Sequence, residues 1–112
     1  MKITIAERKI IDEICTAIQS DCLKKWEVNE LSRQYHISAF KLNTGIKIVH
    51  GCSFKQYILE VQMHQAKEKI KKGSSIYDLV IEFGYSSSYN FTRAFRKVFP
   101  KPPTAYIPIK NR

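Results

Sequence analysis

Apolar residues recur at helical spacing along most of this chain. The first series is Ile10, Ile11, Ile14 and Ile18, and Thr4 stands ahead of it with a hydroxyl that can cap a helix. Sustained apolar/polar alternation is nearly absent, and no Asn-Gly or Asp-Gly hairpin turn occurs. The pattern therefore predicts an all-α protein.

Three further helices are expected before residue 73. A short helix spans residues 28–35. A third helix follows Ser38, whose side chain can cap it, and ends at Gly51. Phe54 to Lys71 predicts one longer helix with apolar residues on more than one face, as a helix between two bodies would need. Gly73 ends it.

Two more helices are expected in the last third of the chain. Either Ser74 or Ser75 can cap a short helix that runs to about Phe83, where Gly84 makes a turn. Either Ser86 or Ser87 can cap the next one. We expect that last helix to carry four apolar anchors before the prolines that begin at residue 100 forbid its continuation: Phe91, Phe95, Val98 and Phe99.

The two units of short helix, turn and helix repeat one another. A shift of 48 residues aligns the short helices, and a shift of 49 aligns the chain after the turn, because the second turn holds one more residue. The register runs from residue 31 to residue 57, which favours a duplication. The aligned pairs include Leu31 and Leu79, Tyr35 and Phe83, His36 and Gly84, Ser38 and Ser87, Leu42 and Phe91, Ile46 and Phe95, Lys47 and Arg96, and Tyr57 and Tyr106.

Each unit has the layout of a helix-turn-helix, in which the second helix enters the major groove of DNA. The charge agrees with an anionic partner. The net charge is +9, and residues 83–112 hold six cations and no acid, whereas the charges of residues 1–29 cancel. In residues 83–99, the regular aromatics anchor a helix and the cations remain for phosphate or base.

Residues 28–106 resemble the DNA-binding domain of AraC/XylS-type transcription regulators. The first half contributes Ser38-x-x-x-Leu42-x-x-x-Ile46-Lys47, then Gly51, Tyr57 and Ala66. The second half is the more specific: Ile76-x-x-Leu79, Phe83-Gly84-Tyr85-Ser86, Phe91-Thr92-Arg93-Ala94-Phe95-Arg96 and Pro103-x-x-Tyr106. The resemblance implies two helix-turn-helix subdomains bridged by a linker helix. This sequence departs from the family pattern at Ser32, His36, Gln62, Val80 and Pro100.

The resemblance also implies which residues meet DNA. The first recognition helix would present Phe40, Asn43 and Thr44 to bases, with Lys41 and Lys47 near phosphates. The second would present Ser88, Tyr89 and Arg93, with Arg96 and Lys97 toward the backbone, and Thr92 is a further candidate for contact with DNA. Chemistry suits Asn43 to adenine, Arg93 to guanine, and Phe40 or Thr44 to a thymine methyl.

The expected organisation is a first helix-turn-helix subdomain over residues 1–53, a linker helix over 54–72 and a second subdomain over 73–112. A helix of roughly 18 residues is about 27 Å long, which can hold two recognition helices near the ~34 Å spacing of successive major-groove faces. One chain can then act as a helix-turn-helix dimer does, regulating transcription through sequence-specific binding of double-stranded DNA. The alternative is a protein-interaction module that kept the fold and lost specific DNA binding.

No constellation of an enzyme, metal centre or cofactor site is evident. The three histidines are scattered, and His50, Cys52 and His64 lack the spacing of a metal set. Cys15 and Cys22 are seven residues apart on one helix, too far for a disulfide, which favours reduced thiols in the cytoplasm.

We further expect RNA polymerase as a partner, a missing N-terminal effector or dimerisation domain, and no membrane association.

Overall fold

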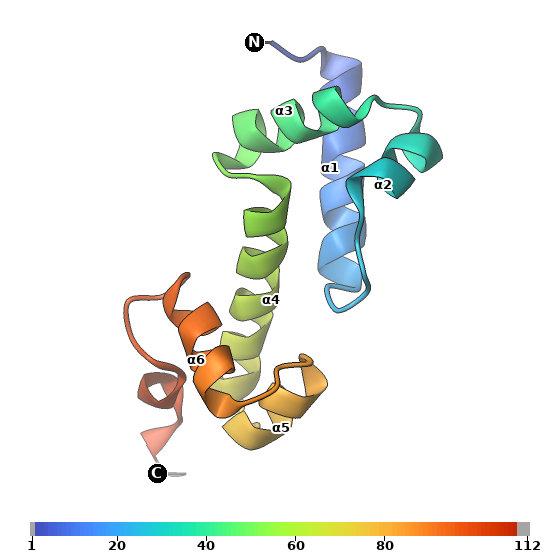
Figure 1. The fold of residues 1–112 in the computed structure, drawn as a ribbon. Helices are drawn as coiled ribbons and strands as arrows, with labels where there is room; N and C mark the ends of the chain where they lie inside the picture. The colour runs from blue at the N-terminus through green and yellow to red at the C-terminus, as the bar shows by residue number, and fades with distance from the viewer. Residues whose placement is uncertain (1, 110–112) are drawn as a thin grey trace. The chain divides into compact units, whose positions relative to one another are not determined.

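The computed structural model describes residues 2–109, and all regular structure in this range is helical. The chain divides after Ile58 into two compact units, and α4 begins in the first and ends in the second (Figure 1). The elements are α1 (Ile5–Ser20), α2 (Val28–Tyr35), α3 (Ala39–His50), α4 (Phe54–Lys71), α5 (Ile76–Glu82), α6 (Ser88–Arg96) and a 3-10 turn, η1 (Pro103–Tyr106).

The caps predicted from the sequence are present. Thr4 and Glu7 form a reciprocal capping box at the start of α1: the Thr4 hydroxyl accepts from the Glu7 N–H at 3.0 Å, and the Glu7 carboxylate accepts from the Thr4 N–H at 2.8 Å. Ser38 caps α3. Of the paired alternatives, Ser75 caps α5 and Ser87 caps α6.

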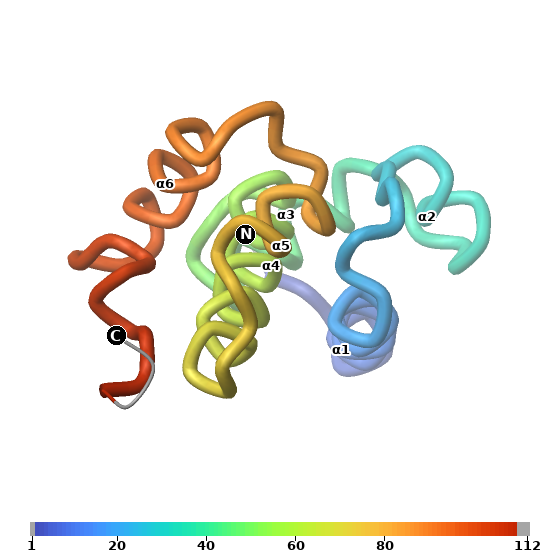
Figure 2. The backbone as a smooth tube through the Cα atoms, turned by 90° about the horizontal axis from the view of Figure 1, so that it is seen from below, coloured from blue at the N-terminus to red at the C-terminus, as the bar shows by residue number. Residues whose placement is uncertain are grey.

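The core of the first unit lies between α1 and α3, which cross one another (Figure 1). Five aliphatic side chains are completely buried there: Ile11, Ile14, Ile18, Leu42 and Ile46. The contact depends on Gly45, because a Cβ atom at that position would lie 2.7 Å from the side chain of Ile11. In Figure 2 the unit is seen nearly along α1.

The second unit repeats this core with different side chains. The C-terminal part of α4 contributes Met63, Ala66 and Ile70, which have the same spacing as Ile11, Ile14 and Ile18 in α1. From α6 come Phe91 and Phe95, both completely buried. Ala94 occupies the place of Gly45 in the repeat and is also buried. In each unit, the second helix of the helix-turn-helix (α3 or α6) therefore packs against a stripe of three buried residues on an earlier helix (α1 or α4).

The two turns also share one unusual backbone conformation. His36, after α2, has φ 54° and ψ 43°, and Gly84, after α5, has φ 79°. Both values lie in the left-handed region, which glycine adopts without cost and other residues adopt at about 1–2 kcal/mol. A Cβ atom at Gly84 would meet no other atom within 4 Å. A side chain at this position would therefore cause backbone strain but no steric clash.

We expect His36→Gly to raise the free energy of unfolding by up to about 1 kcal/mol and Gly84→Ala to lower it by a similar amount. The reason is that one change removes left-handed strain and the other introduces it. Thermal unfolding followed by circular dichroism checks both. The mirrored pair is its own control: equal signs for the two variants would contradict the argument.

One expectation about the last helix is wrong. Val98 and Phe99 were expected within it, but α6 ends at Arg96. The residue before a proline is disfavoured in the α conformation, and Phe99 precedes Pro100. Backbone bonds from Val98 and Phe99 to the carbonyl of Phe95 continue the chain as a tight turn, so Phe99 still reaches the core.

Cys15 and Cys22 are buried and Cys52 is half-buried, each as a thiol and not in a disulfide. Two expectations remain predictions: the subdomain boundaries at residues 53/54 and 72/73, and the spacing of the two expected recognition helices along DNA. Two of the six C-terminal cations, Lys110 and Arg112, lie outside the described residues.

Candidate nucleic-acid interface

The outer surface of α3 follows from what its inner surface buries. Leu42, Gly45 and Ile46 are turned into the first unit, so positions 40, 43, 44 and 47 fall on the opposite side of the helix. Phe40 is 60% exposed, an unusual setting for a phenyl ring. Asn43 and Lys47 are exposed, and Thr44 is half-buried. Four of the five residues predicted for this helix therefore share one accessible face.

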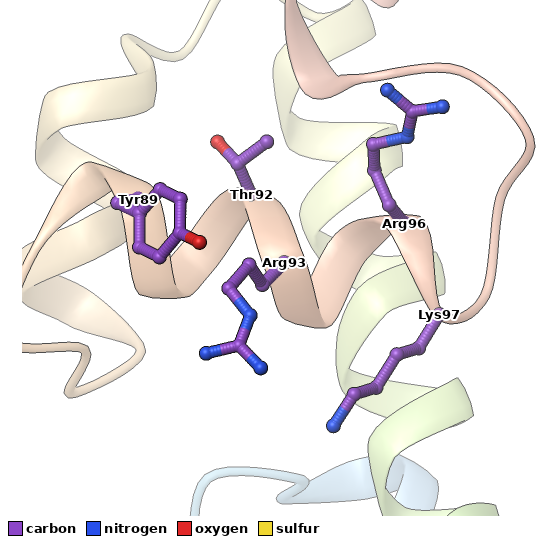
Figure 3. A pocket seen from close by; sticks show the side chains of 5 residues that line it. All are labelled: Tyr89, Thr92, Arg93, Arg96 and Lys97. Atoms are coloured by element: carbon purple, nitrogen blue, oxygen red, sulfur yellow. The ribbon is translucent and has the colours of Figure 1, made fainter.

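The outer surface of α6 arises in the same way, because Phe91, Ala94 and Phe95 are buried. Figure 3 shows Thr92 and Arg96 along one edge of the helix and Arg93 and Lys97 along the other. Five of the six residues predicted for this helix line a shallow hollow of about 430 Å³: Tyr89, Thr92, Arg93, Arg96 and Lys97. The sixth, Ser88, is exposed in the first turn of α6.

Two contacts orient the α6 side chains. The Arg93 guanidinium carbon lies 5.7 Å from the centre of the Tyr89 ring, which is 70% exposed, so the cation rests beside the aromatic face. Arg96 donates a 3.4 Å hydrogen bond to the carbonyl of Pro100. Both guanidiniums keep most of their donors available to a ligand.

Serine caps fix where α3 and α6 begin. Ser38 accepts from the N–H of Lys41 at 3.0 Å, and Ser87 accepts from the N–H of Asn90 at 3.1 Å. The Asn90 side chain also donates to the Ser86 hydroxyl at 2.8 Å. The matching caps place the exposed faces of α3 and α6 at equivalent positions from the helix start.

Lys41 has a protein partner. Its ammonium nitrogen lies 3.2 Å from a carboxylate oxygen of Glu7, which joins α3 to α1. The hydrogen bond from the Thr4 backbone, and then the hydrogen bond from the Lys41 side chain, lower the pKa of Glu7, so the acid is ionised at neutral pH. The role of Lys41 at a phosphate remains a prediction, and the ion pair competes with it.

The repeat reveals a residue that the sequence reasoning missed. With the shift of 49, Ile48 of α3 matches Lys97, and Ile48 is 48% exposed beside Thr44 on the helix surface. The same register that aligned Lys47 with Arg96 was sufficient to find it. We define the α3 face as Phe40, Asn43, Thr44, Lys47 and Ile48, and the α6 face as Tyr89, Thr92, Arg93, Arg96 and Lys97.

The two faces differ in charge. The α6 face carries three cations and the α3 face one, and neither helix contains an acid. None of these four cations lies within 4.0 Å of a carboxylate among residues 2–109, unlike Lys41 and Lys69, which are paired. Unpaired surface cations on a capped helix are suited to binding phosphate.

His50 and His64 lie in different surroundings, and only His50 is described beside a cysteine. His50 Nε2 lies 3.3 Å from Cys15 Sγ, and its ring packs 4.4 Å from that of Tyr57, whereas the ring of His64 packs against Phe99. Burial raises the pKa of the Cys15 thiol, and burial raises that of Tyr57 to about 12. Within the described range, no three acidic, histidine or cysteine side chains form a group that could hold a metal ion.

A family model described as a helix-turn-helix domain matches residues 31–108. The transcriptional activator FapR of Escherichia coli is 28% identical over 97% of this chain, and the chain spans 40% of FapR. A solved AraC-type transcriptional regulator from Chromobacterium violaceum has a TM-score of 0.79 at 17% identity, covering 92% of this chain and 93% of that one. The DNA-binding domain of AdpA, solved with a target DNA, has a TM-score of 0.71 at 16% identity, covering 86% of this chain and 87% of that one.

Among the described residues, no helix is long and apolar enough to cross a membrane.

Proposed function

Since the chain belongs to the helix-turn-helix family of AraC-type transcription regulators, we propose that it binds specific double-stranded DNA through α3 and α6 and so regulates transcription. The observation that carries this proposal is the pair of equivalent exposed faces, each on the second helix of a helix-turn-helix and each starting at a serine cap. The complex of AdpA with its target DNA gives further support.

The side chains divide by the chemistry of DNA. Lys47, Arg96 and Lys97 are exposed charges with which phosphates would pair, an interaction that needs charge more than an exact pose. Arg93 suits a guanine edge and Asn43 an adenine edge, because each can make two parallel hydrogen bonds there. Ser88, Tyr89 and Thr92 would contact bases or sugars beside them.

The function we propose is binding rather than catalysis, in keeping with relatives that are transcriptional regulators. A regulator of this kind works with RNA polymerase in the bacterial cytoplasm, where the DNA lies. Because the chain spans only part of its relatives, we propose that an effector or dimerisation domain accompanies it N-terminally.

Selection of bound duplexes from a random DNA pool tests the proposal. We expect two half-sites about one helical turn apart to emerge, one for each recognition helix. A chain that enriches no sequence, and whose weak binding hardly changes with salt, would instead be a protein-interaction module.

Lys47→Ala should weaken binding to specific and random duplexes by the same factor. Loss of one phosphate contact should also reduce the slope of log K against log salt by about 0.9. Fluorescence anisotropy at several salt concentrations measures both quantities. Lys25→Ala is a matched control, because Lys25 is an exposed lysine outside the recognition helices; an equal change of slope in that variant would refute the role of Lys47.

A further inference from the structure

The α3 face carries a ridge of apolar groups. Phe40, Thr44 and Ile48 are four residues apart in succession, so their side chains follow one another along the helix surface. The side chain of Phe40 is 60% exposed and that of Ile48 is 48% exposed. The methyl of Thr44 lies between them in sequence.

The equivalent positions of α6 have the opposite character. Where α3 has Phe40, Thr44 and Ile48, the shift of 49 places Tyr89, Arg93 and Lys97. One helix thus presents hydrocarbon at the positions where the other presents a phenol and two cations. The two half-sites must therefore be recognised by different chemistry.

We infer that the ridge formed by Phe40, Thr44 and Ile48 recognises thymine through its 5-methyl group. This inference rests on the proposed function. The methyl of thymine is the apolar group that base edges offer in the major groove, and aromatic, threonine and aliphatic side chains contact it. The flanking Asn43 and Lys47 orient the same helix toward adenine and phosphate, which makes an A·T-rich first half-site the matching ligand.

Uracil substitution tests the inference. In a duplex enriched from the random pool by the wild-type chain, each thymine is replaced in turn by uracil, which removes the methyl and leaves every hydrogen-bonding group. Burial of one methyl corresponds to about a fourfold change in affinity. We expect such a loss at one or more thymines, and we expect it to shrink in Phe40→Ala or Ile48→Ala.

Two controls separate this result from general weakening. Arg93→Ala, on the other recognition helix, should keep the full uracil effect. Ile81→Ala truncates an isoleucine of α5 that is 61% exposed, and it should behave as the wild type does. All four variants change exposed side chains, so circular dichroism should show them folded.

The outcomes are distinguishable. If a sequence is enriched but uracil is harmless at every position, or if its effect persists in both ridge variants, the thymine inference is overturned and DNA recognition stands. If no sequence is enriched at all, the proposed function fails, and the inference fails with it.

Discussion

Phe95→Ala should destabilise the second unit by about 3–5 kcal/mol, the cost of deleting a buried phenyl ring and leaving a cavity. The ring is completely buried, and its centre lies 4.8 Å from that of Phe99 and 5.7 Å from that of Tyr106. Chemical denaturation followed by circular dichroism measures the loss. DNA binding that needs α6 should disappear as the unit unfolds.

Phe40→Ala is the matched control, because it makes the same change on the surface of α3. Its effect on stability should stay within about 0.5 kcal/mol. A third variant, Phe95→Leu, preserves an apolar side chain and should cost less than Phe95→Ala. If Phe95→Ala and Phe40→Ala lowered stability equally, the assignment of Phe95 to the core would be wrong.

Arg93→Ala should weaken binding to the selected duplex by about 1–3 kcal/mol and relax the preference at one base pair. The guanidinium lies on the exposed face of α6 beside Tyr89, and no carboxylate of the described chain engages it. Affinity for duplexes that carry each of the four bases at every position measures the effect.

Arg93→Lys is the sharper companion variant. Lysine keeps the charge but lacks the planar fork that donates two parallel hydrogen bonds. We expect Arg93→Lys to retain binding to random DNA and its salt dependence while losing the base preference. Equal losses on specific and random duplexes in both variants would assign Arg93 to phosphate.

Much of the fold follows from local rules that operate within a few residues. Thr4 and the serines ahead of α3, α5 and α6 start those helices, and Gly51 and Gly84 take left-handed conformations where a helix stop and a turn were expected. The helix over Phe54–Lys71 was predicted with both of its ends. The expectation that α6 reaches Phe99 left out the rule that the residue before a proline is disfavoured in the α conformation.

The candidate site was less predictable wherever distant residues meet. The ion pair of Lys41 with Glu7 joins positions 34 residues apart, and no local pattern announces it. The exposure of Ile48 likewise depends on which side of α3 packs against α1. Base assignments for Asn43 and Arg93 depend on the DNA itself, and so they remain predictions.

The repeated core has an evolutionary consequence. In both units, the side chains that hold the helices together and the side chains that we propose to meet DNA occupy separate positions. One half can therefore change the target preference that we propose for it by substitution on its own exposed face, independently of the other half and of either core. The contrast between a hydrocarbon ridge and a cationic face is what such independent divergence would leave behind.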